Sequence, residues 1–479
     1  MFQKAGTGVS IAVGQTVERV LHFRHPHLIS LVGVTGHRER SHTRMKAEVV
    51  TKHLVFPVGN SNLHQGETIV LSNNDQVMPR AHTRMSYFFS PSSADEKDFM
   101  SSEVLQESLA QTLAVFWPVA GKFKERANRG LDIECGAEGI EFLDVRFEGS
   151  FHDELGDHQP KAALASLLPA DLPAMATPAS ETPLLKVQLS RFKCGKVCLT
   201  VAMHHLVCDG KGVTDFVTTW ANIASGKGIS APPHLDRSLL QARNPPRPSF
   251  DHIEYSTLPP PTPSAITTMV AKLFEFSPHR IQNLKGEANR GQDGMPFTAF
   301  DAIAGHVWKC VTKAREIDKS KHVKLGFAID GRQRFAPPLP ATYFGNVNFY
   351  GDLVSEPLSH AAACIQEAKV RVNDEYMRSA LDWVELHTSP LNIFPGFDFF
   401  CSSDLALTSW SRFPAYETDF GWGKPTFFGI PAPGWDGLVI FLPSQYGPDS
   451  INVMVGLTEE HMNNLLNDPS FSPVFPQST

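Results

Sequence analysis

The sequence predicts a mixed α/β protein of two domains, and three observations support this fold class. The chain has 479 residues, which is too long for one ordinary domain and long enough for two hydrophobic cores. A strand pattern is followed directly by a helix pattern near residue 210, as in α/β folds. Residues 224–267 contain nine of the 36 prolines, which is typical of an extended linker.

These elements divide the chain into an N-terminal domain over 45–224, a Pro-rich crossover over 225–267 and a C-terminal domain over 268–479. The strand of the N-terminal domain alternates apolar residues at Val197, Leu199, Val201 and Met203. Its helix repeats them at Val213, Phe216, Val217, Trp220 and Ile223. The C-terminal domain has an early helix with apolar positions at Phe300, Ile303, Ala304, Val307, Trp308 and Val311.

Composition excludes several classes of protein. Hydrophobic residues make up 42% and charged residues 19% of the chain, as in soluble globular proteins. The net charge of −7 argues against a nucleic-acid-binding protein. The sequence contains no run of about eighteen apolar residues, so no membrane span is predicted. The seven cysteines are odd in number and scattered, which favours free thiols in a reducing compartment. We therefore expect a cytoplasmic protein.

The segment His204-His205-Leu206-Val207-Cys208-Asp209-Gly210 lies where the predicted strand stops and the chain turns toward the helix. A side chain there can project into a cavity, and an imidazole is the natural proton acceptor at neutral pH. A hydrogen-bonded structural histidine is the main alternative. A metal site is disfavoured because no second ligand cluster lies nearby, and Cys194 and Cys198 lack a matching pair. Asp209 either orients His205 or holds the turn, and we favour the structural role.

A second motif, Asp419-Phe420-Gly421-Trp422-Gly423, lies far downstream. HxxxDG (His205 to Gly210) and DFGWG together resemble the two signatures of the plant BAHD acyl-CoA-dependent acyltransferases. Further family-like stretches are Trp117 to Lys122, Asp330 to Arg334 and Tyr343-Phe344-Gly345-Asn346. The segments Asp374 to Asp382 and Thr408-Ser409-Trp410 are similar to the shikimate/quinate hydroxycinnamoyltransferase branch. The resemblance runs from about Met45 to the C-terminus.

The resemblance implies two chloramphenicol-acetyltransferase-like domains, a long crossover loop and an active-site channel at the domain interface. It makes His205 the general base and Asp419 an essential residue that holds an arginine, with Arg332 as the expected partner. Structural roles fall to Asp209, Gly210, Gly421, Trp422 and Gly423, and His204 is expected to be structural. Residues implied on the CoA side are Thr298, Asp330, Gly331, Arg332, Arg334, Ser409, Trp410 and Arg412. Acyl-CoA is a co-substrate, and no bound cofactor or metal is expected.

The substrate side departs from the related branch at two positions. His82-Thr83-Arg84-Met85-Ser86-Tyr87 resembles the HTPSVY segment, so His82 and Tyr87 are expected in the acyl pocket, whereas Met85 replaces a serine. Thr408 is expected to bind substrate. Thirteen residues before Thr408, Pro395 stands where shikimate-using members carry an arginine, and proline cannot clamp a carboxylate.

We therefore expect a monomeric acyltransferase of phenylpropanoid metabolism that moves a p-coumaroyl or caffeoyl group from CoA to an alcohol or hydroxy acid. The absence of the carboxylate-binding arginine makes shikimate or quinate a doubtful acceptor. Alternatives are another acyl-CoA donor (acetyl, malonyl or benzoyl), an amine acceptor, and a catalytically inactive ligand-binding homologue.

Residues 1–44 differ from the rest of the chain. They carry six lysines and arginines against two glutamates, a net charge of +4. A basic, acid-poor leader is typical of a transit peptide. Met45-Lys46-Ala47-Glu48 instead resembles the usual start of the related family, so we favour a poorly ordered, non-native extension.

Overall fold

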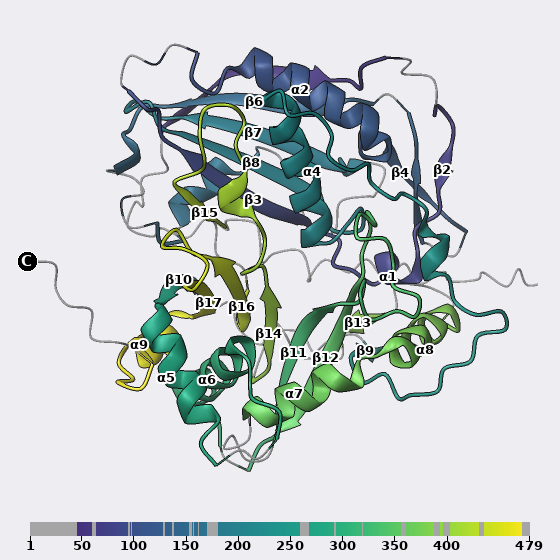
Figure 1. The fold of residues 1–479 in the computed structure, drawn as a ribbon, viewed down its shortest axis with the longest axis vertical. Helices are drawn as coiled ribbons and strands as arrows, with labels where there is room; N and C mark the ends of the chain where they lie inside the picture. The colour runs from purple at the N-terminus through teal and green to yellow at the C-terminus, as the bar shows by residue number, and fades with distance from the viewer. Residues whose placement is uncertain are drawn as a thin grey trace, which may run out of the picture.

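The structure is a computed structural model. It describes residues 46–471 apart from gaps at 60–63, 94–95, 97, 128–129, 137, 153–155, 157, 161, 170–180, 259–267, 292–293, 319, 356–360, 388–392, 396–402 and 431–434. The leader 1–44 lies outside the described residues. Figure 1 shows two sheet-containing halves, one above the other.

The upper half is built on a six-stranded sheet. Its β6–β7 pair is parallel, and its other neighbouring strands are antiparallel. The predicted strand is β8, in which all eight residues are buried, so it lies at the centre of the sheet. In sheet order the strands are β1 (Ala47–Val55), β6 (Ile140–Phe147), β7 (Leu185–Arg191), β8 (Val197–His204), β3 (His82–Phe89) and β15 (Phe427–Gly429).

Helices α2 (Ser102–Val115) and α4 (Gly210–Ala224) cover one face of this sheet (Figure 1). Four residues of the α4 stripe are buried, as their spacing predicted, namely Val213, Phe216, Val217 and Trp220, and Ile223 is half-buried. The indole N–H of Trp220 donates to the Leu105 carbonyl at 3.1 Å and to Ser108 Oγ at 3.0 Å, which joins the two helices. Helix α4 begins at Gly210, before the first apolar position of the stripe, because Asp209 caps it.

The lower half contains the second six-stranded sheet. In sheet order its strands are β10 (Met269–Phe276), β17 (Ile451–Thr458), β16 (Leu438–Pro443), β14 (Leu405–Ser409), β11 (Val323–Asp330) and β12 (Asn348–Ser355). Its helices are α5 (Pro278–Ala288), α6 (Ala299–Ala314), α7 (Ala361–Arg371), α8 (Asp374–Glu385) and α9 (Glu459–Leu466). The predicted helix over 300–311 is α6, and Thr298 and Asp301 form a capping box at its start.

Smaller elements connect the halves. A three-stranded sheet contains β2 (Thr68–Ile69), β5 (Leu131–Glu134) and β4 (Lys122–Glu125), and helix α1 (Asn73–Gln76) lies next to α8. The crossover after α4 contributes β9 (Tyr255–Ser256), which pairs with β13 (Phe394–Pro395). Short 3₁₀ helices span Trp117–Ala120, Ala162–Leu167, Arg237–Leu240 and Ala415–Glu417.

The two halves share a core as well as a boundary. Strand β15 comes from the C-terminal part of the chain, yet it pairs with β3 in the N-terminal sheet. The core beneath α4 contains Val207 and Cys208 together with Phe344 and Trp410 from beyond the crossover. Burial of this apolar surface holds the halves together around the end of β8.

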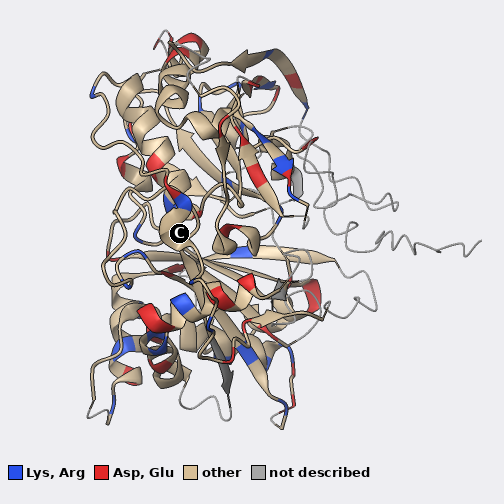
Figure 2. Cartoon of the chain, turned by 90° about the vertical axis from the view of Figure 1, so that its right-hand side faces the viewer, with Lys and Arg blue, Asp and Glu red and all other residues tan. Residues whose placement is uncertain are grey.

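Three further findings concern the described residues. Among the described residues, no helix is long and apolar enough to cross a membrane. Within the same residues, no group of three or more histidine, cysteine, aspartate or glutamate side chains is placed to hold a metal ion. Basic and acidic residues are interspersed over both halves in Figure 2, consistent with the small net charge.

Candidate active site at the end of β8

The end of β8 places His205 between a strand and a helix N-terminus. The last strand residue, His204, donates its N–H to the Leu184 carbonyl at 2.8 Å. The N–H of His205 donates to the Ala81 carbonyl at 2.8 Å, just before β3 begins. Asp209 then caps α4, because its Oδ1 accepts the Gly212 N–H at 3.0 Å. The His205 backbone is thus fixed from both sides, while its side chain is partly exposed.

The imidazole of His205 is oriented by Asn346, which lies between β11 and β12. Nδ1 of His205 is 3.1 Å from Oδ1 of Asn346. The amide group of Asn346 donates from Nδ2 to Asp75 Oδ1 at 2.9 Å and to the His205 carbonyl at 2.8 Å. Because both donors face acceptors, Oδ1 is the atom turned toward His205, and Nδ1 must carry the proton. Nε2 is then the basic nitrogen.

Asp75 of α1 holds Asn346 in this orientation. The fully buried carboxylate accepts from the Asn346 N–H and Nδ2 at 2.9 Å and from Arg237 Nη1 at 2.8 Å. Its other oxygen accepts from the N–H and hydroxyl of Ser72, the capping residue of α1. A chain of buried hydrogen bonds therefore runs from the crossover residue Arg237 to the ring of His205, and it fixes the ring before any substrate binds.

The surroundings favour the neutral, basic form of His205. Burial lowers the pKa of His205, and this effect outweighs the negative charges of Asp209 and Asp75 and the hydrogen bond with Asn346, which raise it. A histidine whose pKa lies below its ordinary value is unprotonated at neutral pH. The ring can therefore accept a proton from a substrate through Nε2, and no described residue hydrogen-bonds that atom.

Asp209 pairs with Arg332 and makes no hydrogen bond to His205. Arg332 Nη1 donates to Asp209 Oδ2 at 2.8 Å and Nη2 donates to Oδ1 at 3.0 Å, and both side chains are 2% exposed. The second oxygen of Asp209 also accepts the Val347 N–H at 3.1 Å. Both carboxylate oxygens of Asp209 are therefore occupied by partners other than His205. The Asp209–Arg332 pair joins HxxxDG in the N-terminal half to the Asp330 to Arg334 stretch in the C-terminal half.

This pairing corrects the expectation that Asp419 holds Arg332. Asp419 Oδ1 accepts the backbone N–H groups of Gly421 at 2.8 Å and Gly423 at 2.9 Å, so it closes its own loop. Gly421 and Gly423 have φ values of 106° and 100°, which side chains rarely tolerate. Phe420 is buried against Trp220 of α4, with ring centroids 5.0 Å apart. The DFGWG loop thus packs on the helix that follows His205 and does not contact the histidine.

Comparisons with known proteins identify the family to which the chain belongs. A family model described as the Transferase family matches residues 45–472. The chain belongs to this family, the BAHD acyltransferases. A hydroxycinnamoyltransferase of Narcissus pseudonarcissus is 37% identical over 82% of this chain and 92% of its own length. A shikimate O-hydroxycinnamoyltransferase of Nicotiana tabacum is 34% identical over 87% of this chain and 98% of its own length.

Solved structures support the BAHD fold. Vinorine synthase covers 89% of this chain and 98% of its own chain, with a TM-score of 0.69 and 21% identity. TRI101 of F. sporotrichioides, complexed with coenzyme A and T-2, covers 84% of this chain and 98% of its own, with a TM-score of 0.71 and 19% identity. These likenesses confirm the predicted fold class of two chloramphenicol-acetyltransferase-like domains. The protein is an acyl-CoA-dependent acyltransferase by family, as predicted.

His82 and Tyr87, expected together in the acyl pocket of this BAHD protein, lie on opposite faces of β3 because they are five residues apart. His82 faces His204, with ring centroids 5.1 Å apart, and its Nε2 is 2.8 Å from the Pro183 carbonyl. Tyr87 is fully buried, and its hydroxyl is 3.8 Å from Met85 Sδ. Met85 therefore packs beside Tyr87. The structure does not bring the imidazole of His82 and the hydroxyl of Tyr87 together.

Several residues expected on the CoA side already have structural partners. All the N–H groups of the buried Arg332 have acceptors: Asp209, Asp330 and the Tyr343 and Gly345 carbonyls. Arg332, expected on the CoA side, therefore has no free N–H group to offer a CoA phosphate. Arg334 Nη1 donates to the Val372 carbonyl at 2.8 Å, and Thr298 caps α6.

The remaining residues of the CoA set differ in exposure. Ser409 Oγ is 3.0 Å from Ser411 Oγ, and Trp410 stacks on Phe413 with ring centroids 6.1 Å apart. Arg412 is exposed. Gly210 and Gly331 allow close packing, since an added Cβ would lie 3.0 Å from Phe413 and 2.7 Å from Met377 Sδ, respectively. Thr408 in β14 is partly exposed, which leaves it available to a substrate.

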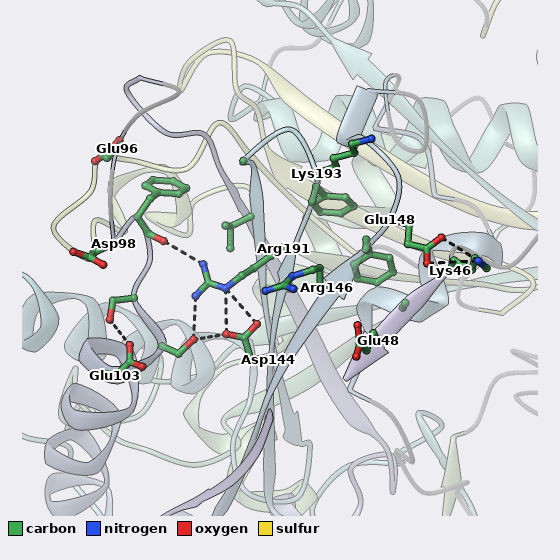
Figure 3. Close-up of a pocket in the computed structure, with 18 residues that line it drawn as sticks. Lys46, Glu48, Glu96, Asp98, Glu103, Asp144, Arg146, Glu148, Arg191 and Lys193 are labelled. Atoms are coloured by element: carbon green, nitrogen blue, oxygen red, sulfur yellow. Dashed lines mark hydrogen bonds and ion pairs between the residues drawn. The ribbon is translucent and has the colours of Figure 1, made fainter. Parts of the chain in front are cut away.

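A separate hollow of about 1180 Å³ lies at the outer edge of the N-terminal sheet, among β1, β6 and β7 (Figure 3). At its centre, Arg191 Nε donates to both carboxylate oxygens of Asp144, and its other nitrogens donate to the Phe99 and Met100 carbonyls. None of the predicted site residues lines it. The hollow is therefore separate from the candidate site at the end of β8.

Asn346 and Asp75 are the site residues that sequence reasoning missed. Asn346 lies in the family-like stretch Tyr343 to Asn346, so its neighbourhood carried a signal although no role was assigned to it. The only local signal at Asp75 is the Ser72-x-x-Asp75 spacing of a capping box, which predicts a helix start and not a contact with the site.

Proposed function

We propose that this BAHD protein transfers a hydroxycinnamoyl group, p-coumaroyl or caffeoyl, from CoA to a hydroxyl acceptor, with His205 as the general base. The observation that carries the proposal is the hydrogen-bond chain from Asp75 through Asn346 to His205 Nδ1, which leaves Nε2 as the base. The choice of acyl group is supported by relatives named as hydroxycinnamoyltransferases at 34–37% identity.

In this mechanism Nε2 of His205 removes the proton of the acceptor hydroxyl as its oxygen attacks the thioester carbonyl. A tetrahedral intermediate forms with a negative charge on the former carbonyl oxygen. Its collapse breaks the carbon–sulfur bond, and the CoA thiolate leaves and takes the proton from the His205 imidazolium. No covalent enzyme intermediate is required. Asn346 keeps the ring in one tautomer through both proton transfers, while the Asp209–Arg332 pair holds the two halves in register.

Because proline cannot bind a carboxylate, Pro395 supports a neutral acceptor or one whose carboxylate is bound by another residue. We place Thr408 on the acceptor side. An amine acceptor is the second candidate, because relatives from Avena sativa at 34–35% identity are named hydroxycinnamoyl-CoA:5-hydroxyanthranilate N-hydroxycinnamoyltransferases. On the donor side, we propose Thr298, Asp330, Gly331, Arg334, Ser409, Trp410 and Arg412 as the residues near CoA, and we omit Arg332 because its N–H groups are occupied.

We also propose an N-terminal domain over 45–224, a crossover over 225–267 and a C-terminal domain over 268–479. Strand β15 returns from the C-terminal domain to the N-terminal sheet. We further propose that the protein is a cytoplasmic monomer and that residues 1–44 are not needed for activity. Removal of residues 1–44 tests the last point, since we expect kcat and KM within about twofold of the full chain.

The deciding experiment measures thiol release from p-coumaroyl-CoA with a panel of alcohols, hydroxy acids and amines, with products identified by mass spectrometry. His205→Ala should lower kcat by about 10²- to 10⁴-fold. The adjacent His204→Asn is the matched control, because His204 is 3% exposed and packs against His82 and Phe123, and the Asn oxygen can replace His204 Nδ1 as the acceptor of the Leu206 N–H. Equal turnover by wild type and His205→Ala would refute the general-base assignment, as would equal losses in the two variants.

A further inference from the structure

Helix α8 presents a stripe of three buried polar side chains to the crossover. Tyr376, Ser379 and Asp382 follow one another at intervals of three residues, which places them along one face of the helix. Their exposed fractions are 2%, 0% and 0%. Burial of polar groups is costly unless they are hydrogen-bonded, so a buried stripe of this kind indicates a specific partner. That partner is the crossover segment 243–255.

Asp382 holds the beginning of this segment. Its two carboxylate oxygens accept from the N–H of Arg243 at 2.7 Å, from Nε of Arg243 at 2.6 Å and from the N–H of Arg247 at 2.8 Å. Two backbone donors of an extended, proline-rich loop are thus satisfied by one side chain. Between them lie Pro245 and Pro246, which cannot donate hydrogen bonds of their own.

The middle of the segment is held by Ser379, which contacts His252. Oγ of Ser379 accepts the N–H groups of Ser249 at 2.8 Å and Phe250 at 3.2 Å. The same oxygen is 2.8 Å from Nε2 of His252. Because its two lone pairs are occupied by backbone donors, the hydroxyl must donate its own proton to Nε2. The ring of His252 therefore carries its proton on Nδ1.

Nδ1 of His252 is 2.8 Å from Oε1 of Glu254, whose other oxygen accepts the hydroxyl of Tyr376 at 2.8 Å. The network thus closes on α8, with Ser379 and Tyr376 at its two ends. Its serine–histidine–glutamate order resembles a hydrolase triad, but Ser379 is fully buried and its lone pairs are occupied. Its role must therefore be positional.

The segment directly after Glu254 leads to the acceptor side. Tyr255 stacks on Trp383 of α8, with ring centroids 5.4 Å apart. Tyr255 and Ser256 form β9, which pairs antiparallel with β13, so that Tyr255 lies opposite Pro395. In Figure 1, β9 and β13 lie beside α8. The backbone at Pro395, where an arginine would hold an acceptor carboxylate, is therefore aligned by a strand that α8 holds in place.

The other side of α8 leads toward His205. Asn73 of α1 donates from Nδ2 to the Leu381 carbonyl at 3.1 Å and to Glu385 Oε2 at 2.7 Å. The next residue, Asn74, donates to the Asn346 carbonyl at 2.8 Å. Helix α8 therefore contacts both the β9–β13 pair and the helix that orients the Asn346–His205 dyad.

We propose that the His252–Glu254–Ser379–Tyr376 network is the positioning element for the acceptor: it fixes β9 and β13 relative to the catalytic histidine and so sets acceptor affinity. This inference rests on the proposed acyl transfer. Within the described part of the chain, no hydrogen bond joins these four residues to His205 or to a residue proposed near CoA, so we expect a change in the network to alter acceptor binding more than proton transfer or acyl-CoA binding. A shift of the acceptor by about 1 Å can cost up to roughly 10²-fold in rate.

The test is the steady-state kinetics of Ser379→Ala, which removes one oxygen and leaves two backbone donors and His252 without their partner. We expect kcat/KM for the acceptor to fall by about 5- to 100-fold, mainly through KM. The KM for p-coumaroyl-CoA should stay within about twofold, and the acid limb of the pH profile should not move, because His205 is untouched. Ser379→Thr keeps the hydroxyl and should restore most of the acceptor KM.

Tyr376→Phe is the second variant if Ser379→Ala does not fold, because it removes only the hydroxyl bound to Glu254. Ser108→Ala is the matched control: Ser108 is also buried and accepts an N–H, that of Trp220, but it lies between α2 and α4. We expect this control to lower Tm without changing either KM. An unchanged acceptor KM in Ser379→Ala and Tyr376→Phe would overturn the inference, as would equal rises in both KM values. Absence of wild-type turnover with every acceptor would instead refute the proposed function.

Discussion

Asp209→Asn separates a structural role of Asp209 from a role in orienting His205. The substitution is nearly isosteric, but it removes the charge that pairs with Arg332 and replaces one oxygen by an N–H₂ donor. Both oxygens of Asp209 accept two hydrogen bonds: Oδ1 from Gly212 N–H and Arg332 Nη2, and Oδ2 from Arg332 Nη1 and Val347 N–H. Whichever way the new amide turns, its donors face other donors, so the charge of Arg332 loses its main partner.

The cost follows from burial. Both side chains are 2% exposed, so water cannot replace the lost partner, and the other carboxylate near Arg332, Asp330, is 51% exposed. Removing one member of a buried ion pair costs about 3–5 kcal/mol. At about 2–4 °C per kcal/mol, Tm should fall by roughly 6–20 °C.

The pH dependence of this cost has a definite sign. Burial by itself would raise the pKa of Asp209, but the charge and hydrogen bonds of Arg332 and the N–H groups of Gly212 and Val347 lower it below its ordinary value. A carboxylate with a lowered folded-state pKa contributes stability above its unfolded pKa and loses it as the pH falls through the folded pKa. The difference in Tm between wild type and Asp209→Asn should therefore be full at pH 7 and shrink in acid.

The assay combines thermal unfolding at pH 7 with turnover of p-coumaroyl-CoA well below the Tm of the variant. We expect a large loss of Tm and a kcat within about tenfold of wild type, because Asp209 makes no hydrogen bond to His205. Asp419→Asn is the control, since Asp419 binds only its own loop and its loss should cost about 1 kcal/mol. An unchanged Tm with a loss of kcat near 10⁴-fold, as for an orienting aspartate, would refute the reasoning.

Four further predictions follow from the site. Asn346→Leu leaves the Nδ1–H of His205 without its acceptor, and an unpaired buried donor costs about 1–3 kcal/mol. We therefore expect kcat, measured by thiol release, to fall by about 5- to 150-fold. Because burial lowers the pKa of His205, the acid limb of kcat/KM should have its midpoint below pH 6.5 and the rate should rise with pH to a plateau at neutrality; a midpoint above 6.5 would contradict the environment described. Thr298→Ala should lower the unfolding free energy by about 0.5–2 kcal/mol through loss of the α6 cap, whereas Thr298→Ser should not, and a raised KM for acyl-CoA in both variants would support a contact with CoA. Shikimate should be a poor acceptor with a high KM, and Pro395→Arg should improve its KM by about tenfold or more with little change in kcat; a low wild-type KM for shikimate would contradict the importance of this position.

The position of His205 could be predicted from sequence because it lies at a local change of pattern. The alternation that ends at Met203, followed by helical spacing from Val213, placed His205 at the end of a strand, and β8 and α4 have nearly these bounds. The apolar spacing over 300–311 likewise predicted the helix α6. Such features depend on residues close in the chain, so a single sequence contains them.

The partners of these residues were harder to predict from the sequence. The sequence motif DFGWG suggested that Asp419 holds Arg332, but Asp209 holds it instead, from 123 residues away. The spacing between the two motifs says nothing about which carboxylate reaches the guanidinium. That choice depends on how the two halves meet, and in the folded protein Asp419 is turned toward its own glycines.

The sequence by itself determined the fold class, the two-part organisation, the family and the position of the histidine, because each follows from local periodicity or from motifs. Only the tertiary structure decided that Asn346 and Asp75 orient His205, across separations of 141 and 271 residues between successive partners. It also decided that Ser379 of α8 is hydrogen-bonded to His252 of the crossover, and that Met85 lies against the Tyr87 hydroxyl. These contacts depend on which surfaces are buried against each other, and burial is a property of the assembled chain rather than of any segment.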